Sequence, residues 1–387
     1  MKKVIFSVLL CASAAIAGEC LAEAEIVWAK TISRPSDRYC GWPSVCDAGN
    51  GEILVAYSGD RNAHVCPWGK VRSMRSADGG ETWSESETVC NTVLDDRDAG
   101  LLKLSNGELV LFWFTSVHYY ENKINVKKNP DYGRHFEKLG MDAVRRDLGS
   151  FSRKSGDGGR TWSAPVRLPA SAPHGGIQLA DGRLMVVGNQ DSQVRAHMKT
   201  DPEEKAFAGV RQFLVVAESK DSAASWHELA RIPVLSGSAY EPHLIEGADG
   251  VLRCYVRTSR NLLYTESRDG GSSWTPLKPT SIPSWDSPPY LLRLKDGKTL
   301  LTYARRIVHA KDRKEWKSGV FARIGDENGS LESFEAAGEI MVRELKIWDM
   351  GYPGTVECAD GSLLTVFYGR EGQEACTIQA VKWRRKK

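Results

Sequence analysis

The sequence has no long apolar run beyond its first residues and no marked excess of either charge. Its 52 Lys and Arg residues are nearly matched by 49 Asp and Glu residues, so the formal net charge is +3. Such a slight surplus does not indicate a nucleic-acid groove, and the basic end at residues 384–387 is typical of solvated surface. Because no other segment is apolar enough to cross a bilayer, we expect no membrane span.

Helical periodicity and metal-ligand spacings are scarce as well. Only residues 137–148 show a helical pattern, and we expect them to belong to an insertion. The cysteines fit no zinc spacing, and nothing in the sequence requires a metal or an organic cofactor. Cys40 with Cys46, or Cys66 with Cys90, are conceivable disulfides, but buried free thiols fit equally well.

The beginning of the chain predicts export. A basic start is followed by an apolar stretch and small residues, the pattern of a signal peptide. We expect this peptide to occupy residues 1–22, with cleavage after Ala17 or Ala22, and one mature domain to occupy residues 23–387. The protein is then periplasmic or secreted, and the acidic residue before Cys20 does not favour a lipoprotein anchor.

A repeated pattern, S-x-D-x-G-x-[TS]-W, marks the chain. Clear copies begin at Ser76, Ser155 and Ser267, and a degenerate copy begins at Ser219. Its Asp can accept hydrogen bonds from its own turn, its Gly allows a positive φ, and its Trp is a large anchor for packing. The pattern resembles the Asp-box of sialidase-like β-propellers, and we interpret its residues as structural.

A second repeat predicts six hairpins. In each, Asn-Gly or Asp-Gly joins a short strand-like run to an apolar strand. The six turns are Asn50-Gly51, Asn106-Gly107, Asp181-Gly182, Asp249-Gly250, Asp296-Gly297 and Asp360-Gly361. We therefore predict an all-β fold, a six-bladed β-propeller of four-stranded antiparallel blades. Residues 375–383 would pair with residues 25–30 to close the ring.

This topology also locates a site. Because the Gly turns share one face, the start of each first strand and the end of each second strand meet on the opposite face, near the axis. Many of the residues predicted there are ionisable, which is the usual sign of a functional site. The candidates are Asp60, Arg61, His64, Arg97, Asp98, His174, Gln190, Glu241, His243, Arg257, Arg305, Arg306 and Tyr352.

The order of these residues resembles that of the sialidase family over essentially the whole mature chain. By that resemblance Tyr352 is the nucleophile, Glu241 accepts its proton, and Asp60 is the acid/base. Arg257 and Arg306, or Arg305 in its place, would hold the carboxylate of the substrate. The remaining candidates would bind other parts of the sugar.

The sequence departs from the family at one position. Where sialidases carry the Arg of an Arg-Ile-Pro motif, this chain has Gly41-Trp42-Pro43, so one of three carboxylate-binding arginines is missing. Arg38 or Arg97 are spatial substitutes to consider. The segments His64–Lys70 and Asp95–Asp98 are also unusual and suggest a rebuilt site for another sugar.

The sequence is compatible with three functions. The favoured one is an exo-acting glycoside hydrolase that removes a terminal acidic sugar, with sialic acid as the leading candidate. A rhamnosidase or polysaccharide lyase acting at uronic-acid linkages would rely on His64, His174 or His243 instead. The third is a glycan-binding propeller without catalysis. In each case we expect a monomer whose partner is a glycan.

Overall fold

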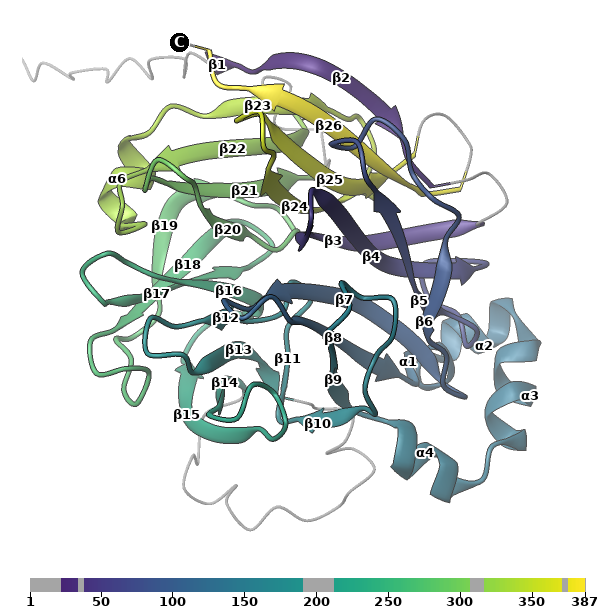
Figure 1. The fold of residues 1–387 in the computed structure, drawn as a ribbon. Coiled ribbons are helices and arrows are strands. Elements are labelled where there is room, and N and C mark those ends of the chain that lie inside the picture. The colour runs from purple at the N-terminus through teal and green to yellow at the C-terminus, as the bar shows by residue number, and fades with distance from the viewer. Residues whose placement is uncertain (1–21, 34–37, 191–211, 307–316, 371–374, 387) are drawn as a thin grey trace, which may run out of the picture.

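The computed structural model describes residues 22–33, 38–190, 212–306, 317–370 and 375–386. Within these ranges six antiparallel sheets surround a common axis as the blades of a propeller (Figure 1). The predicted fold class is confirmed. The expected signal peptide lies outside the described residues, apart from its last position.

Each blade is a meander that runs from an inner strand at the axis to an outer strand at the rim. Blade one consists of β3 (Tyr39–Gly49), β4 (Glu52–Arg61), β5 (Lys70–Ser76) and β6 (Glu87–Cys90). Blade two consists of β7 (Asp95–Lys103), β8 (Leu109–Ser116), β9 (Ser150–Ser155) and β10 (Val166–Leu168). Blade three consists of a split inner strand, β11 (Ala170–Ser171) and β12 (Ile177–Gln178), with β13 (Leu184–Gln190), β14 (Gln212–Ser219) and β15 (His227–Val234).

The second half of the ring follows the same plan. Blade four consists of β16 (Tyr240–Glu246), β17 (Leu252–Arg257), β18 (Asn261–Ser267) and β19 (Lys278–Pro283). Blade five consists of β20 (Tyr290–Arg293), β21 (Thr299–Arg305), β22 (Gly319–Gly325) and β23 (Ile340–Glu344), with β1 (Ala22–Glu23) added parallel to β23. Blade six consists of β24 (Gly351–Glu357), β25 (Leu363–Gly369), β26 (Thr377–Arg384) and β2 (Glu25–Thr31).

The two ends of the propeller domain close the ring. Strand β2, from the start of the chain, pairs antiparallel with β26 and forms the outer strand of blade six, as predicted. The indole of Trp383 on β26 is fully buried and donates a hydrogen bond of 2.9 Å to Thr365 Oγ1 on β25. Ring closure leaves few free sheet edges, which is how propellers limit edge-to-edge association.

The Asp-boxes hold the turns between the two outer strands of blades one to four. In the copy between β9 and β10, Asp157 accepts hydrogen bonds from the Thr161 N–H (2.9 Å) and hydroxyl (2.6 Å). Its Oδ1 also accepts one of 2.7 Å from the Ser155 hydroxyl. The degenerate copy keeps this geometry, with Ser222 and Ala223 at φ of 54° and 64° where glycines would otherwise stand. The expected structural role of these boxes agrees with these contacts.

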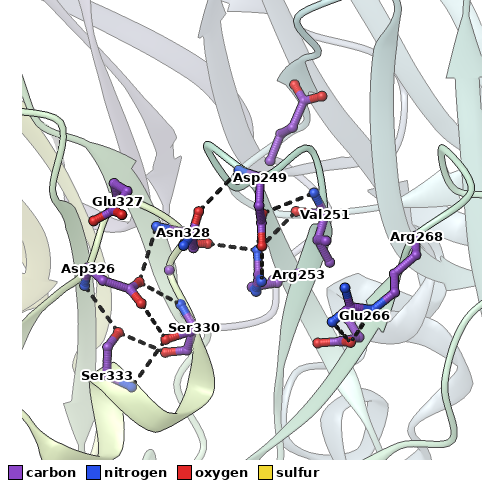
Figure 2. A network of polar contacts seen from close by, with 12 residues as sticks. Asp249, Val251, Arg253, Glu266, Arg268, Asp326, Glu327, Asn328, Ser330 and Ser333 are labelled. Carbon is purple, nitrogen blue, oxygen red and sulfur yellow. Dashed lines mark hydrogen bonds and ion pairs between the residues drawn. The ribbon is translucent and has the colours of Figure 1, made fainter.

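A polar network on the Gly-turn face connects blades four and five (Figure 2). Arg253 on β17 donates to Asp249 Oδ2 (2.7 Å) and to the carbonyl oxygen of Asn328 (3.1 Å), which follows β22. The backbone N–H of Asp249 in turn donates to Asn328 Oδ1 at 3.1 Å. Arg253 is only 5% exposed, so this charged contact is largely shielded from water and fixes the position of β17 relative to blade five.

Helices lie outside the sheets. α1 (His118–Glu121), α2 (Lys123–Lys128), α3 (Pro130–Lys138) and α4 (Met141–Asp147) form the insertion between β8 and β9, and α6 (Leu331–Ala336) lies between β22 and β23. The single helix expected over residues 137–148 is wrong, because Leu139 and Gly140 adopt extended backbone between α3 and α4. The helical insertion is also longer than the sequence pattern indicated. None of the helices in the described part of the chain has the length and apolar character that a membrane crossing requires.

The cysteines of the propeller are thiols. All seven that the structure describes are free and buried, so neither conceivable disulfide forms. Cys46 and Cys90 lie in the apolar layer between blades one and two, where burial raises the pKa of Cys46 to about 12. They act there as small apolar side chains.

One prediction concerns the close approach of blades two and three. A Cβ on Gly100 of β7 would lie 2.4 Å from the backbone nitrogen of Gly175, and backbone cannot move aside as a side chain can. We expect Gly100→Ala to lower the free energy of unfolding by on the order of 2 kcal/mol. Gly156→Ala is the matched control, since a Cβ on Gly156 would meet nothing within 4 Å. Denaturant unfolding of both variants checks this, and equal stability would contradict the packing described.

Candidate active site

Four side chains reach the axis because the backbone that carries them is left-handed. Trp42, Asp98, Glu241 and Tyr352 have φ of 53°, 50°, 48° and 55°. Each lies at a register shift near the start of an inner strand, where a bulge redirects the side chain. Left-handed backbone costs a non-glycine residue roughly 1–2 kcal/mol. Strain of this kind is concentrated at functional sites.

Tyr352 and Glu241 meet across the axis from blades six and four. The Tyr352 hydroxyl donates to Glu241 Oε1 at 2.6 Å. Arg257, at the end of β17, donates from Nη1 to Tyr352 Oη at 2.9 Å and to Glu241 Oε2. The sequence prediction that these three residues come together is consistent with this geometry.

Neighbouring blades hold both strained backbones in place. The N–H of Tyr352 donates at 3.1 Å to Ser287 Oγ, in the segment between blades four and five. The N–H of Glu241 donates to Asn189 Oδ1 of blade three at 2.9 Å. Contacts with blade three and with the segment between blades four and five therefore fix the relative position of the phenol and the carboxylate.

The surroundings keep the phenol of Tyr352 protonated. Burial raises its pKa well above the ordinary value, the negative charge of Glu241 raises it further, and Arg257 opposes them. A neutral phenol thus donates to a carboxylate that can accept its proton, beside a guanidinium that can stabilise the resulting phenolate. This is the arrangement of a nucleophile with an adjacent general base.

Arg305 and Arg306 face different environments. The Arg306 guanidinium lies 5.8 Å from the ring centroid of Tyr352 and donates to the Tyr368 hydroxyl (2.9 Å) and the Met350 carbonyl (2.6 Å). Arg305 is bound within blade five by Glu339 at 2.7 Å. Of the two alternatives for the third arginine, Arg306 is the one beside the axis.

Arg97 lies against Trp42, the residue that stands where the resemblance calls for arginine. Its guanidinium stacks 4.5 Å from the ring centroid of Trp42, which is 1% exposed. Its Nε has no hydrogen-bond partner among the described residues and lies 3.7 Å from Asp98 Oδ1. Trp42 in turn lies 6.4 Å from Tyr352, ring to ring, so Arg97 adds a third positive charge near the axis.

Asp98 is enclosed beside the phenol. It is 2% exposed, and its Oδ1 has no hydrogen-bond partner in the described structure. Burial raises the pKa of Asp98 to about 7; the Arg97 charge opposes this shift and the Glu241 charge adds to it. Asp98 can therefore carry a proton near neutral pH.

Asp60 differs from Asp98 because two cationic side chains contact its carboxylate. It lies near the end of β4 with a φ of 57° and accepts from Lys70 Nζ at 2.8 Å and from Arg72 Nη1 at 3.2 Å. Burial acts to raise its pKa, but the hydrogen bond from Lys70 and the nearby cations hold the pKa of Asp60 below its usual range. Asp60 is therefore ionised in this structure, and its side chain is about one-third exposed.

His64 belongs to a separate network that the sequence did not predict. Its Nδ1 lies 3.0 Å from Asp349 Oδ1, and Asp349 also accepts from the hydroxyls of Tyr39 (2.9 Å) and Tyr368 (3.1 Å). Burial lowers the pKa of His64, so the imidazole is neutral at neutral pH. Burial alone would raise the pKa of Asp349, but the hydrogen bonds from His64 and the tyrosines lower it to about 2.

The other candidates lie beneath the site or outside the described residues. Arg61 and Asp95 form a fully buried ion pair with two bonds of 2.6 and 2.8 Å. His174 and His243 are 1% and 3% exposed, and burial lowers the pKa of each to about 3. The side chain of Gln190 is outside the described part of the structure.

A family model described as "BNR repeat-like domain" matches residues 103–365. The chain belongs to this family. No significant match was found among curated proteins.

Solved structures share the propeller fold of this chain. A Dyadobacter fermentans protein of unknown function is 21% identical with a TM-score of 0.72, over 95% of this chain and 100% of that one. The NanB sialidase from Streptococcus pneumoniae is 15% identical with a TM-score of 0.60, over 94% and 71% of the two chains. The intramolecular trans-sialidase from Ruminococcus gnavus is 15% identical with a TM-score of 0.57, over 94% and 96%. At these identities the likeness shows the fold alone.

A positional signal in this BNR repeat-like chain could have identified the axial residues. Trp42, Asp98, Glu241 and Tyr352 each stand eight positions before the first residue of a hairpin turn. No such signal marks Tyr39, because its place near the axis depends on Asp349 of another blade.

The raised pKa of Asp98 should make the stability of the protein depend on pH. Its pKa of about 7 in the folded protein exceeds the value of about 3.9 expected in an unfolded chain. Between these values the folded protein holds a proton that the unfolded chain has lost, so Asp98 lowers stability as pH rises. We expect Asp98→Asn to become progressively more stable than the wild type as pH is raised from about 4 to about 8.

Thermal unfolding over that pH range measures the difference in stability between Asp98→Asn and the wild type. Asp142→Asn is the control, because the side chain of Asp142 is 98% exposed and its removal should cause no comparable pH trend. A constant difference between Asp98→Asn and the wild type at every pH would contradict the raised pKa.

Proposed function

We propose that this protein is an exported, exo-acting glycoside hydrolase that removes a terminal acidic sugar from glycans. The observation that carries the proposal is the hydrogen bond of 2.6 Å between the Tyr352 hydroxyl and Glu241. Both residues are held in strained backbone on different blades, which a merely structural tyrosine does not require. Sialidases among the solved structures with this fold make sialic acid the first sugar to test.

In the proposed reaction Tyr352 Oη attacks the anomeric carbon while Glu241 accepts the phenolic proton. The bond from that carbon to the leaving oxygen breaks, and Asp60 supplies the proton that the oxygen takes up. Water then attacks the anomeric carbon while Asp60 accepts a proton from the water. The bond from that carbon to Tyr352 Oη breaks, and Glu241 returns its proton to the departing phenolate. Retention of the anomeric configuration is the expected outcome.

Asp60 must be protonated to act as the acid. In the structure described, Lys70 and Arg72 keep it ionised. A sugar bound against Asp60 would displace water and loosen these contacts, and desolvation raises the pKa of a carboxyl group. Asp98 already has a raised pKa, but its enclosure suits it better to binding a sugar hydroxyl than to reaching the leaving oxygen.

The charge around Tyr352 favours an anionic sugar. Arg257 and Arg306 lie against its ring at 5.9 and 5.8 Å, and Arg97 is the third cation nearby. A carboxylate on the sugar would be attracted by these guanidinium groups. A neutral tyrosine also approaches such a sugar without the repulsion that a carboxylate nucleophile would meet.

The two other functions differ in their support. A His-based lyase or rhamnosidase is disfavoured by the burial of His174 and His243, although His64 remains partly exposed. A non-catalytic glycan-binding propeller is supported by Trp42, which stands where the resemblance calls for arginine. Activity on a panel of glycosides separates these possibilities.

The nucleophile is tested by Tyr352→Phe. Loss of the hydroxyl should lower kcat/KM by on the order of 10³-fold or more, because no other described group is placed to attack. Release of 4-methylumbelliferone from its sialoside and other glycosides is the assay. His174→Ala serves as the comparison: activity that survives in Tyr352→Phe but is lost in His174→Ala would favour a His-centred reaction.

The role of Arg97 is tested by Arg97→Ala. A charge-assisted contact contributes about 1.5–3 kcal/mol, so KM for an anionic glycoside should rise about tenfold or more. Because the contact is to the substrate rather than to the reacting atoms, kcat should change much less. A variant whose kcat falls while KM stays constant would show that Arg97 does not bind the carboxylate.

A further inference from the structure

The segment that joins β19 to β20 is bonded to backbone at the edge of the candidate site. Within it, the N–H of Asp286 donates at 3.2 Å to the carbonyl oxygen of Thr258, which directly follows Arg257 at the end of β17. The carbonyl oxygen of Trp285 accepts a hydrogen bond of 3.4 Å from the N–H of Arg306. The segment is thus fixed relative to two of the arginines that surround the axis.

The same segment packs against the strand that carries the phenol. Ser287 Oγ accepts the hydrogen bond from the Tyr352 N–H, and a Cβ on the preceding Gly351 would lie only 2.7 Å from that oxygen. The Ser284 hydroxyl donates at 2.5 Å to the carbonyl oxygen of Ser287, which tightens the turn. Asp286, inside this turn, has left-handed backbone with a φ of 53°. Contacts on both sides therefore hold Asp286 in one position relative to Tyr352.

The carboxylate of Asp286 lies next to Arg257, the arginine that contacts both Tyr352 and Glu241. Asp286 Oδ1 is 3.7 Å from Arg257 Nη2, which is too long for a hydrogen bond. No described residue donates a hydrogen bond to the Asp286 side chain, which is 32% exposed. Asp286 therefore keeps its capacity to accept hydrogen bonds beside the guanidinium that touches the proposed nucleophile and base.

The other carboxyl groups of the candidate site are differently placed. Glu241, Asp60 and Asp349 each accept hydrogen bonds from two or more side chains of the protein. Asp98 is enclosed, with 2% of its surface exposed. Of these five groups, Asp286 alone is both open to solvent and without a hydrogen bond from a described residue. A ligand that displaces water from Asp286 must therefore supply a donor, because an unpaired carboxylate is costly to desolvate.

We propose that Asp286 determines sugar specificity by accepting a hydrogen bond from a hydroxyl group of the bound sugar. This assignment rests on the proposed function, because it takes the sugar to bind at Tyr352. A hydrogen bond to a carboxylate is stronger than one between neutral groups, and a rigidly held acceptor selects a hydroxyl by its position. The same negative charge disfavours an anionic group at this point, so a hydroxyl rather than the sugar's carboxylate is placed against Asp286.

Titration calorimetry in the Tyr352→Phe background, where turnover is stopped, tests this assignment. The probes are methyl α-sialoside and its analogues that each lack one hydroxyl group. One analogue should bind about tenfold or more weakly than the parent sialoside, because its missing hydroxyl leaves Asp286 without a donor. Adding Asp286→Gly should weaken the parent by a similar factor and leave that one analogue within about twofold of its former affinity.

The variants are chosen to preserve the fold. Asp286→Gly removes the carboxylate at a position where glycine adopts the required left-handed backbone readily. Asp286→Asn keeps the shape and one acceptor oxygen, so it should retain part of the discrimination between the parent and that analogue. Asp142→Asn is the control for loss of one negative charge, since the Asp142 side chain is 98% exposed on α4 and should affect no affinity.

A purely structural role for Asp286 gives a different result. If Asp286 only orients Arg257, Asp286→Gly will weaken the parent and every analogue by the same factor, which overturns the assignment. Equal affinity of the parent and all analogues before Asp286 is changed would overturn it as well, and so would the failure of every probe to bind.

Failure of this assignment is distinguishable from failure of the proposed function, because calorimetry requires binding but not turnover. A sialoside that binds with the expected dependence on Asp286, but that the wild type does not cleave, would support the assignment and contradict hydrolysis. Cleavage of the methylumbelliferyl sialoside, together with affinities that Asp286→Gly leaves unchanged, would support hydrolysis and overturn the assignment.

Discussion

The contact between Tyr352 and Glu241 depends on closure of the propeller ring. The two residues are 111 positions apart and come from blades six and four, so no local segment can form the pair. Strand β2 completes blade six, whose inner strand β24 carries Tyr352. Hydrogen bonds from Ser287 and Asn189 then hold the left-handed backbone at both residues. The fold thus stores local strain in order to bring a phenol and a carboxylate together.

The carboxyl groups of the candidate site differ in pKa and therefore in protonation. Asp349 is ionised because hydrogen bonds from His64 and two tyrosines stabilise its charge. Asp60 is ionised through Lys70 and Arg72. Asp98 Oδ1 has no hydrogen-bond partner among the described residues, and burial raises the pKa of Asp98 to about 7. Environments that separate pKa values in this way allow neighbouring carboxyl groups to take different roles.

The sequence predicted the fold because its signals are local and repeated. Each Asn-Gly or Asp-Gly turn specifies a hairpin, and six hairpins with Asp-boxes leave few alternatives to a ring. The same topology predicted that Tyr352, Glu241 and Arg257 would lie together. It also placed Arg61 and His174 near the axis, but could not tell an exposed group from one buried beneath it.

The features that sequence reasoning missed depend on contacts between distant segments. Whether Arg305 or Arg306 faces the axis depends on the twist at the end of β21, and the partner of Arg305 is Glu339 on another loop. The docking of α3 on blade one depends on the contact of the Tyr132 hydroxyl with Asn62 Oδ1. Neither contact produces a periodic pattern in the sequence from which it could be predicted.

The most direct test of the central claim is the mass of the protein quenched in acid during turnover of a substrate found in the glycoside panel. If Tyr352 attacks the sugar, peptide mapping will locate one covalently bound sugar on the peptide that contains Tyr352. An adduct on another residue, or inversion of the anomeric centre with no adduct, would contradict the account.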